Sequence, residues 1–390
     1  MHYPDRVKWI AGASSEAWDI HYQALQDAIA DPEVIVLSVG DPDFATPAPI
    51  IEVAQEALRN GDTHYTPILG IEPLRQAISE TYRSIGAKHL NSESIAVLAG
   101  AQNALFSASL CTLSPNDEVI TLDPAYVTYE AAIGVSGAKL VRVSGNPKNG
   151  FRPNLEAIDN AITPATRAIA FSTPNNPSGM ALNRQEMQAL VELAHKHDLW
   201  LWSDEVYAQI MFENEHVSLS QFDQAQERSI VIGSLSKSYA MTGWRVGWIA
   251  GPQSLIRHIE NLSLCMLYGL PGFIQQAAVH ALQQESIHVK SMRDTYLKRR
   301  DLAVSLLKDE PTLELIVPQA GMFILIDVRK TGLSSNQFVR DLYVQQKVSV
   351  LDGAAFSPQL DGYIRLSFTN GEQQLAKACA RLKQFLKGCD

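Results

Sequence analysis

The sequence predicts an α/β protein with a large domain, built on a mostly parallel sheet covered by helices, and a smaller α+β domain made from both chain ends. Three observations support this prediction. Short β-branched runs alternate with helix-like stretches over much of the chain, which is typical of βαβ units. After about Pro252 a long helical stretch replaces this alternation. The 390 residues are also too many for one hydrophobic core.

The large domain is expected to comprise residues 48–285. A short strand at 34–38 and a turn-rich loop precede it, and helices are predicted at 49–59 and up to about Ser84. The strand-like runs that follow are residues 95–98, 119–122, 139–143, 168–172, 199–203, 230–233 and 246–250. Helix-like segments separate several of these runs, at residues 103–112, 126–135, 155–161 and 184–195.

The small domain is expected to combine residues 1–47 with residues 286–390. The long helical stretch ends at about Leu307, and a second set of elements comes after it. This set has predicted strands at 322–327, 348–351 and 363–368, and predicted helices at 336–345 and 372–386.

Composition narrows the classes of function. The net charge is −10, and no basic run offers a surface for nucleic acid or anionic membranes. Four cysteines without a C-x-x-C pair predict no metal site and no disulfide framework, which fits a reducing cytoplasm. No stretch approaches eighteen apolar residues, so we expect neither a membrane span nor a membrane partner.

Polar side chains follow three of the predicted strands, at the point where each strand ends. Asn176 follows the strand at 168–172, Asp204 and Tyr207 follow the strand at 199–203, and Lys237 follows the strand at 230–233. The carboxyl ends of parallel strands meet at one edge of a sheet, where open α/β sheets bind ligands. These side chains are therefore expected to converge.

An anion site is predicted beside them. The strand at 95–98 ends in the small-residue turn of Gly100, Ala101 and Gln102, which opens a helix whose free N–H groups and dipole attract negative charge. Ser234 can add a hydroxyl. Arg245, which we expect inside an apolar strand, can add a cation because such an arginine requires an anion or a carboxylate.

Each of these residues has an ordinary structural explanation. Asp204 could cap a helix, Lys237 could extend its stem along a sheet edge, and the glycine turn could be purely structural. Their combination suits pyridoxal 5′-phosphate (PLP), whose aldehyde condenses with a lysine amine. Asp204 would keep the ring nitrogen protonated, Tyr207 and Asn176 would bind the phenolic oxygen, and Tyr126 could stack on the ring.

The motifs of the chain also resemble those of a known family. From about Val34 to the C-terminus the sequence resembles the class I/II aminotransferases of PLP fold type I. The residues that carry the resemblance are Gly40; Tyr65, Gly70, Leu74 and Arg75; Pro124, Tyr126 and Tyr129; Asn176, Pro177, Ser178 and Gly179; Asp204, Glu205, Val206 and Tyr207; Ser234, Ser236, Lys237, Arg245 and Gly247; Gly321, Met322 and Phe323; and Arg365.

The resemblance implies roles and a partner. Lys237 would be the Schiff-base lysine, and Arg365 would bind the substrate α-carboxylate with help from Asn176 and the backbone of Gly40. Tyr65 would reach the phosphate in the neighbouring subunit, which implies a homodimer with shared active sites. The implied reaction is a ping-pong exchange in which an L-amino acid gives its amino group to the cofactor and a 2-oxo acid then accepts it.

The substrate is predicted from Gln102 and from sequence stretches outside these motifs. Gln102 and the loop at 265–272 lack the cation that some aspartate-using relatives place there, which disfavours a dicarboxylate. The stretches at 17–22 and 260–269 resemble those of arginine–pyruvate transaminases. Asp19, walled by Trp18 and Tyr268, could bind a guanidinium, although Asp19 could equally cap a helix that begins near Ile20.

Other functions stay open at this point. Aspartate, aromatic or other neutral amino acids are alternative donors, and carbon–sulfur β-lyases use the same scaffold. A regulator fused to a DNA-binding module is disfavoured because only about forty residues precede Gly40. A cofactor-free Schiff-base lyase would have no use for Asp204 or for the anion site.

Overall fold

The central feature of the computed structural model is a sheet of seven strands, and the structure describes residues 2–3, 7, 10, 18–284 and 287–388. The strands lie in the order β2-β8-β7-β6-β5-β3-β4. Only β8 runs antiparallel to its neighbours β2 and β7. The strand bounds are β2 Ile95–Leu98, β3 Glu118–Asp123, β4 Lys139–Ser144, β5 Thr166–Ser172, β6 Trp200–Asp204, β7 Ser229–Ser234 and β8 Gly247–Ala250.

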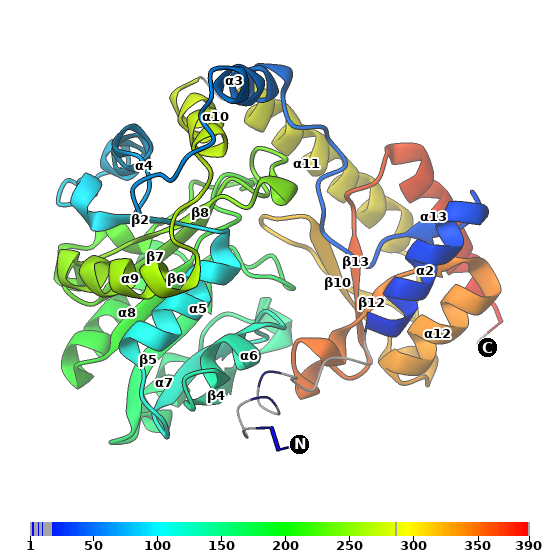
Figure 1. Ribbon diagram of the computed structural model, residues 1–390. Helices are drawn as coiled ribbons and strands as arrows, with labels where there is room; N and C mark the ends of the chain where they lie inside the picture. Colours follow the sequence, from blue (N-terminus) through cyan, green and yellow to red (C-terminus); the bar gives the residue numbers. More distant parts are fainter. Residues whose placement is uncertain (1, 4–6, 8–9, 11–17, 285–286, 389–390) are drawn as a thin grey trace.

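Helices cover both faces of this sheet (Figure 1). Alternate strand residues face opposite sides, so Ile169 and Leu201 pack on one face while Ala170 and Trp202 pack on the other. The first face is covered by α3 Ala48–Arg59, α4 Glu72–Ser84, α7 Leu155–Ala161, α8 Arg184–His197 and α10 Gly272–Gln283. The second face is covered by α5 Ala101–Thr112, α6 Tyr129–Gly134 and α9 Gln253–Met266. The expected α/β fold with a helix-covered, mostly parallel sheet is confirmed.

A second, smaller sheet lies at the right of Figure 1. Its antiparallel strands have the order β12-β13-β10-β9, with bounds β9 Glu314–Ile316, β10 Phe323–Asp327, β12 Leu351–Asp352 and β13 Tyr363–Ser367. A separate parallel pair joins β1 Ile35–Val36 to β11 Val348–Ser349. The helices around these strands are α2 Asp19–Ala30, α11 Ile287–Leu307, α12 Ser335–Gln346 and α13 Glu372–Leu386. Residues near both ends of the chain therefore build one core.

Some element boundaries differ from the sequence prediction. The long helical stretch is three helices, α9, α10 and α11, and Gly269 and Pro271 lie at the break between α9 and α10. The predicted strand at 348–351 is broken into β11 and β12, which join different sheets. None of the described helices combines the length and the hydropathy needed to cross a membrane.

Candidate active site

A cavity of about 170 Å³ lies at the carboxyl edge of the central sheet. Ser172, Asp204 and Ser234 are the last residues of β5, β6 and β7, and all three line it. These strands are parallel, so their ends meet at this edge as the sequence predicts. The rest of the lining is Ala101, Gln102, Leu105, Tyr126, Asn176, Val206, Tyr207, Ser236, Lys237, Thr242 and Arg245.

Lys237 is the amine of this cavity. Its side chain is half-buried, and Nζ donates a hydrogen bond of 2.6 Å to the carbonyl oxygen of Gly40. The pKa of Lys237 is lowered from 10.5 to about 8. Burial is the main cause, since it penalises the ammonium form; Asp41 opposes the shift, and Arg365 and Arg245 add to it. A larger share of Lys237 is therefore neutral at neutral pH than for an ordinary lysine.

Asp204 is a buried carboxylate with few partners. Burial raises its pKa to about 6, with Glu205 adding to the rise, while hydrogen bonds from the Val206 amide and the Tyr129 hydroxyl lower it. Both of these hydrogen bonds are long, at 3.3 Å. The Asp204 carboxylate can therefore accept a further donor from the cavity.

The predicted anion site lies at the turn from β2 into α5. Gly100 is the N-cap of α5 with φ of +85°, and a Cβ there would lie 2.4 Å from a guanidinium nitrogen of Arg245. Arg245 donates hydrogen bonds to the carbonyl oxygens of Thr242 at 2.7 Å and Ala99 at 3.3 Å. The expectation that Arg245 lies inside a strand is wrong, because it is left-handed at φ of +56° and precedes β8.

Serine hydroxyls complete this corner of the cavity. Ser234 donates to the carbonyl oxygen of Val246 at 2.8 Å and accepts from the amide of Ser236 at 3.0 Å. The bond to Val246 holds the segment before Lys237 against the residue that links Arg245 to β8. The cavity therefore has N–H groups, hydroxyls and a guanidinium at one end, and Lys237 and Asp204 elsewhere in its wall.

Arg365 reaches the site from the smaller sheet. It lies in β13 and is 2% exposed, with its guanidinium 3.9 Å from the ring centre of Phe323 and 4.8 Å from that of Phe356. It donates to Asn176 Oδ1 at 2.8 Å and to the carbonyl oxygen of Ser38 at 2.7 Å. Its Nε is buried without a partner among the described residues. Burial lowers the pKa of Arg365 to about 10.

Seven of the predicted residues do not line this cavity. Gly40, Gly100 and Arg365 each lie against a residue that does line it. The other four are Tyr65, Tyr268, Trp18 and Asp19. Tyr65 is 88% exposed, and its ring centre is 4.9 Å from that of Tyr268. Trp18 is half-buried against a cluster that includes Phe356, and Asp19 is exposed. Asp19 is the first residue of α2, and Trp18, at the N-cap position, makes no capping hydrogen bond with its side chain. The alternative in which Asp19 caps a helix beginning near Ile20 is therefore wrong. Ala17 lies outside the described residues.

Several residues that shape the site have no role predicted from the sequence. Tyr129 contacts Asp204, Ser38 holds Arg365, and the rings of Phe323 and Phe356 lie close to the guanidinium of Arg365. Tyr129 and Phe323 belong to motifs already noted, so a signal for them existed. Ser38 and Phe356 act through a backbone oxygen and a ring contact, which leave no distinctive pattern in a sequence.

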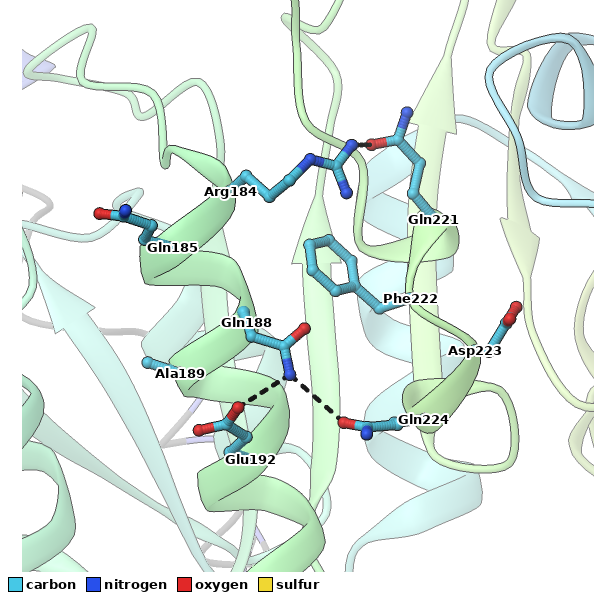
Figure 2. A pocket seen from close by; sticks show the side chains of 9 residues that line it. All are labelled: Arg184, Gln185, Gln188, Ala189, Glu192, Gln221, Phe222, Asp223 and Gln224. Carbon is cyan, nitrogen blue, oxygen red and sulfur yellow. Dashed lines mark hydrogen bonds between the residues drawn. The ribbon is translucent and has the colours of Figure 1, made fainter.

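Other hollows carry less chemistry. One of about 630 Å³ lies between α8 and residues 221–224 (Figure 2), where Gln188 bonds to Glu192 and Gln224. It shares no residue with the cavity at Lys237. Within the described part of the chain, no group of three or more His, Cys, Asp or Glu side chains could hold a metal ion.

Comparison with known proteins identifies the family. Residues 32–382 match the family described as aminotransferase class I and II. The chain belongs to the class I and II aminotransferases. Its enzymatic activity is thus that of an aminotransferase, and members of this family use PLP.

Relatives within the aminotransferases differ in substrate. Arginine–pyruvate transaminase AruH of Pseudomonas aeruginosa is 48% identical, over 98% of this chain and 97% of the relative. An aromatic-amino-acid aminotransferase of Thermococcus litoralis is 34% identical, over 91% of this chain and 92% of its own. The solved aspartate aminotransferase of Thermus thermophilus with maleate has a TM-score of 0.93 at 31% identity, covering 99% of this chain and 100% of its own. These relatives place the chain in PLP fold type I.

The residues of this aminotransferase fit PLP. The turn at Gly100 leaves open the space that a Cβ would fill, next to the guanidinium of Arg245, and so suits a phosphate. The Asp204 carboxylate has room for a donor such as a protonated ring nitrogen. Lys237 offers an amine with a lowered pKa in the same cavity. The donor set thus matches the phosphate, the ring and the aldehyde of this cofactor.

Proposed function

We propose that this aminotransferase uses PLP to move the α-amino group of L-arginine to pyruvate by a ping-pong mechanism. The observation that carries the proposal is the 48% identity, over nearly the whole chain, to a relative named arginine–pyruvate transaminase. The other relatives named above, with aspartate or aromatic amino acids in their names, are 31% to 34% identical. We therefore favour arginine over these alternative donors.

The proposed roles follow from the chemistry of each side chain. When bound, PLP supplies an aldehyde that bonds to the amine and a ring that withdraws electrons. Lys237 takes the α-proton of the substrate and returns it to the cofactor side, and its lowered pKa supports this exchange. Asp204 holds the proton of the ring nitrogen, while Tyr207 and Asn176 bind the phenolic oxygen. Gly100, Ala101, Gln102, Ser234 and Arg245 hold the phosphate, and Tyr126 stacks on the ring.

The α-carboxylate is assigned to Arg365. Its guanidinium fork can bind both carboxylate oxygens, and the unpartnered Nε leaves it a donor to spare. Asn176 and Ser38 already fix two of its nitrogens, so little order is lost when substrate binds. Gly40, whose carbonyl oxygen accepts from Lys237, lies in the same segment as Ser38, and we propose that its backbone N–H supports the carboxylate.

The substrate side chain is assigned to Trp18, Asp19 and Tyr268. His21, in the first turn of α2 with Asp19, contacts Ser38, and Ser38 accepts a hydrogen bond from Arg365. This turn therefore lies close to the arginine assigned to the substrate carboxylate. A dicarboxylate would need a cation for its second carboxylate. Gln102, where some relatives place that cation, is uncharged and accepts a hydrogen bond from Thr128 at 2.7 Å. Asp19 with aromatic neighbours suits a guanidinium better than a second carboxylate.

A homodimer completes this assignment. Tyr65 is exposed beside Tyr268, and Thr66 Oγ1 donates to the carbonyl oxygen of Leu270 at 2.8 Å, so the two loops form one surface. We propose that this surface meets the active site of a second copy, where Tyr65 binds the phosphate and Tyr268 lines the side-chain pocket.

A half-transamination screen tests the substrate. The PLP form of the enzyme is mixed with one amino acid at a time, and the decay of its visible absorbance gives a rate for each donor. Arginine is expected to react at least about tenfold faster than alanine, phenylalanine or aspartate at equal concentration. Pyruvate should then restore the absorbance in a second step, as a ping-pong exchange requires.

Two variants control the screen. Asp19→Asn should slow arginine selectively and leave alanine unchanged, whereas Lys237→Ala should abolish reaction with every donor and remove the yellow colour of the bound enzyme. Arginine no faster than alanine would overturn the choice of donor. Pyruvate and ammonia released steadily from cystathionine, without any oxo acid, would instead indicate a β-lyase.

A further inference from the structure

The segment that follows β1 connects two functional side chains. The carbonyl oxygen of Ser38 accepts a hydrogen bond of 2.7 Å from Arg365, and the carbonyl oxygen of Gly40 accepts one of 2.6 Å from Lys237. The orientation of this short segment therefore sets where the guanidinium of Arg365 lies relative to the amine of Lys237.

The side chain of Ser38 is held by a histidine that the reaction does not use. His21 Nδ1 lies 2.8 Å from Ser38 Oγ, and Ser38 Oγ lies 3.1 Å from Ser349 Oγ. Ser38 and Ser349 are fully buried, and His21 is 7% exposed. A buried hydroxyl between an imidazole and a second hydroxyl is fixed from α2 on one side and from β11 on the other.

Arg365 depends on Ser38 for its orientation. Its two terminal nitrogens donate to Asn176 and to Ser38, and the rings of Phe323 and Phe356 confine its plane. A displaced Ser38 carbonyl would rotate the fork within that plane and spoil two-point binding of a carboxylate, which needs both donors aligned.

The imidazole is suited to a position beside a cation. Burial lowers the pKa of His21, and the nearby charge of Arg365 lowers it further, so the ring is neutral at neutral pH. A neutral imidazole holds Ser38 without repelling Arg365, which a lysine or arginine at the same place would do.

We propose that His21 is a positioning residue for the carboxylate-binding arginine, acting through the hydroxyl and then the carbonyl of Ser38. The inference rests on the proposed role of Arg365. It assigns His21 to the part of the substrate that every donor and acceptor shares, whereas Trp18 and Asp19, in the same segment, are assigned to the side chain that differs between substrates.

The competing explanation is that His21 only fills space. Its ring centre is 5.5 Å from those of Trp18 and Tyr22, so packing alone could require an aromatic ring here. His21→Phe keeps the ring and removes the hydrogen bond, Ser38→Ala removes the hydroxyl, and His21→Asn restores a short polar group. Together these variants separate packing from positioning.

The test measures the inhibition constant of propionate in the PLP form of the enzyme, together with kcat and KM for several donors. Propionate has a carboxylate but neither an amino nor an oxo group. His21→Phe should raise the inhibition constant of propionate and the KM of every donor by the same factor, roughly 3- to 10-fold, with kcat nearly unchanged. Adding Ser38→Ala should cost little more, because both changes break one connection. His21→Asn should recover part of the loss.

Two reference variants make the outcomes distinct. Arg365→Lys should weaken propionate binding more than His21→Phe does. If Arg365→Lys has no effect, the proposed role of Arg365 is itself wrong. His89→Phe changes a half-buried histidine outside the site, one whose Nδ1 has no partner among the described residues, and should leave propionate binding unaffected. If Arg365→Lys acts and His21→Phe lowers only the melting temperature, or affects only one donor, the positioning role is overturned.

Discussion

At the scale of single residues, the protonation of Lys237 is set by opposing neighbours. Burial, Arg365 and Arg245 favour the neutral amine, while the carboxylate of Asp41 favours the ammonium form. The neutral amine is the nucleophile that captures an aldehyde. Lys237 should therefore capture PLP at a lower pH than an ordinary lysine would.

The rate of PLP capture by the cofactor-free enzyme should report this balance. It is expected to rise about tenfold per pH unit below a midpoint near pH 8 and to level off above it, since deprotonation creates the reactive form. Asp41→Asn should move the midpoint to lower pH and speed capture at pH 7. Glu80→Gln, on an exposed part of α4, removes the same charge and should change nothing. A midpoint near 10.5 in the unmodified enzyme would contradict the lowered pKa.

The residues that the sequence could place are those at strand ends. Asn176, Asp204, Tyr207 and Lys237 line one cavity because each follows a parallel strand, and alternation alone predicts where those strands end. Arg365 could not be placed by the same rule. It comes from the antiparallel small sheet, and its position depends on how the two sheets pack, so only the family resemblance indicated it.

At the scale of elements, the turn between β2 and α5 depends on a single missing side chain. Gly100 has φ of +85° and lies against the guanidinium of Arg245, which itself has a left-handed backbone. The sequence indicates a glycine turn before a helix, but the left-handed conformation of Arg245 has no pattern of its own. That is why the sequence leads us to expect Arg245 inside a strand, whereas the structure begins β8 at Gly247.

Gly100→Ala should therefore harm the cofactor site more than the fold. The new Cβ would lie 2.4 Å from Arg245, so the guanidinium must move and PLP affinity should fall by roughly 10- to 100-fold. Gly61→Ala is the matched control, since Gly61 has φ of +83° but nothing within 4 Å of the added Cβ. Both changes should lower the free energy of unfolding by about 1–3 kcal/mol. PLP titration and urea unfolding separate the two effects. Equal PLP affinity in both variants would refute a phosphate site at the turn of Gly100.

At the scale of the whole molecule, the active site joins two cores. β13 carries Arg365 from the small sheet, and the strand ends carry Lys237 and Asp204 from the large one. The sequence predicts both sets of elements because strand-like runs and helix-like stretches differ in their hydrophobic periodicity. The boundary at residues 47/48 and 285/286 stays a prediction, and residues 285–286 lie outside the described part of the chain. The sequence cannot give the distance between the sheets, which long-range contacts such as Arg365–Asn176 determine.

Whether two copies of the chain share their active sites is also a question about the whole molecule. Tyr65 and Tyr268 lie together on an exposed surface and do not line the cavity of their own chain. If a second copy receives them, a Lys237→Ala chain and a Tyr65→Ala chain damage the same site when they pair. In such a hybrid one site carries both changes and the other carries neither. Neither variant alone can form an intact site.

Mixing the two variants under conditions that exchange subunits should therefore restore activity. With random pairing, roughly a quarter of all sites become intact, so turnover should approach about a quarter of the unmodified value. Each variant treated alone provides the baseline, and Lys237→Ala mixed with Asp204→Ala provides the matched control. Lys237 and Asp204 line the same cavity, but in that hybrid each chain damages its own site, so no intact site forms. Recovery in the first mixture alone would place Tyr65 in the partner's site. If the first mixture stays at its baseline although its subunits exchange, Tyr65 serves its own chain and the shared site is excluded.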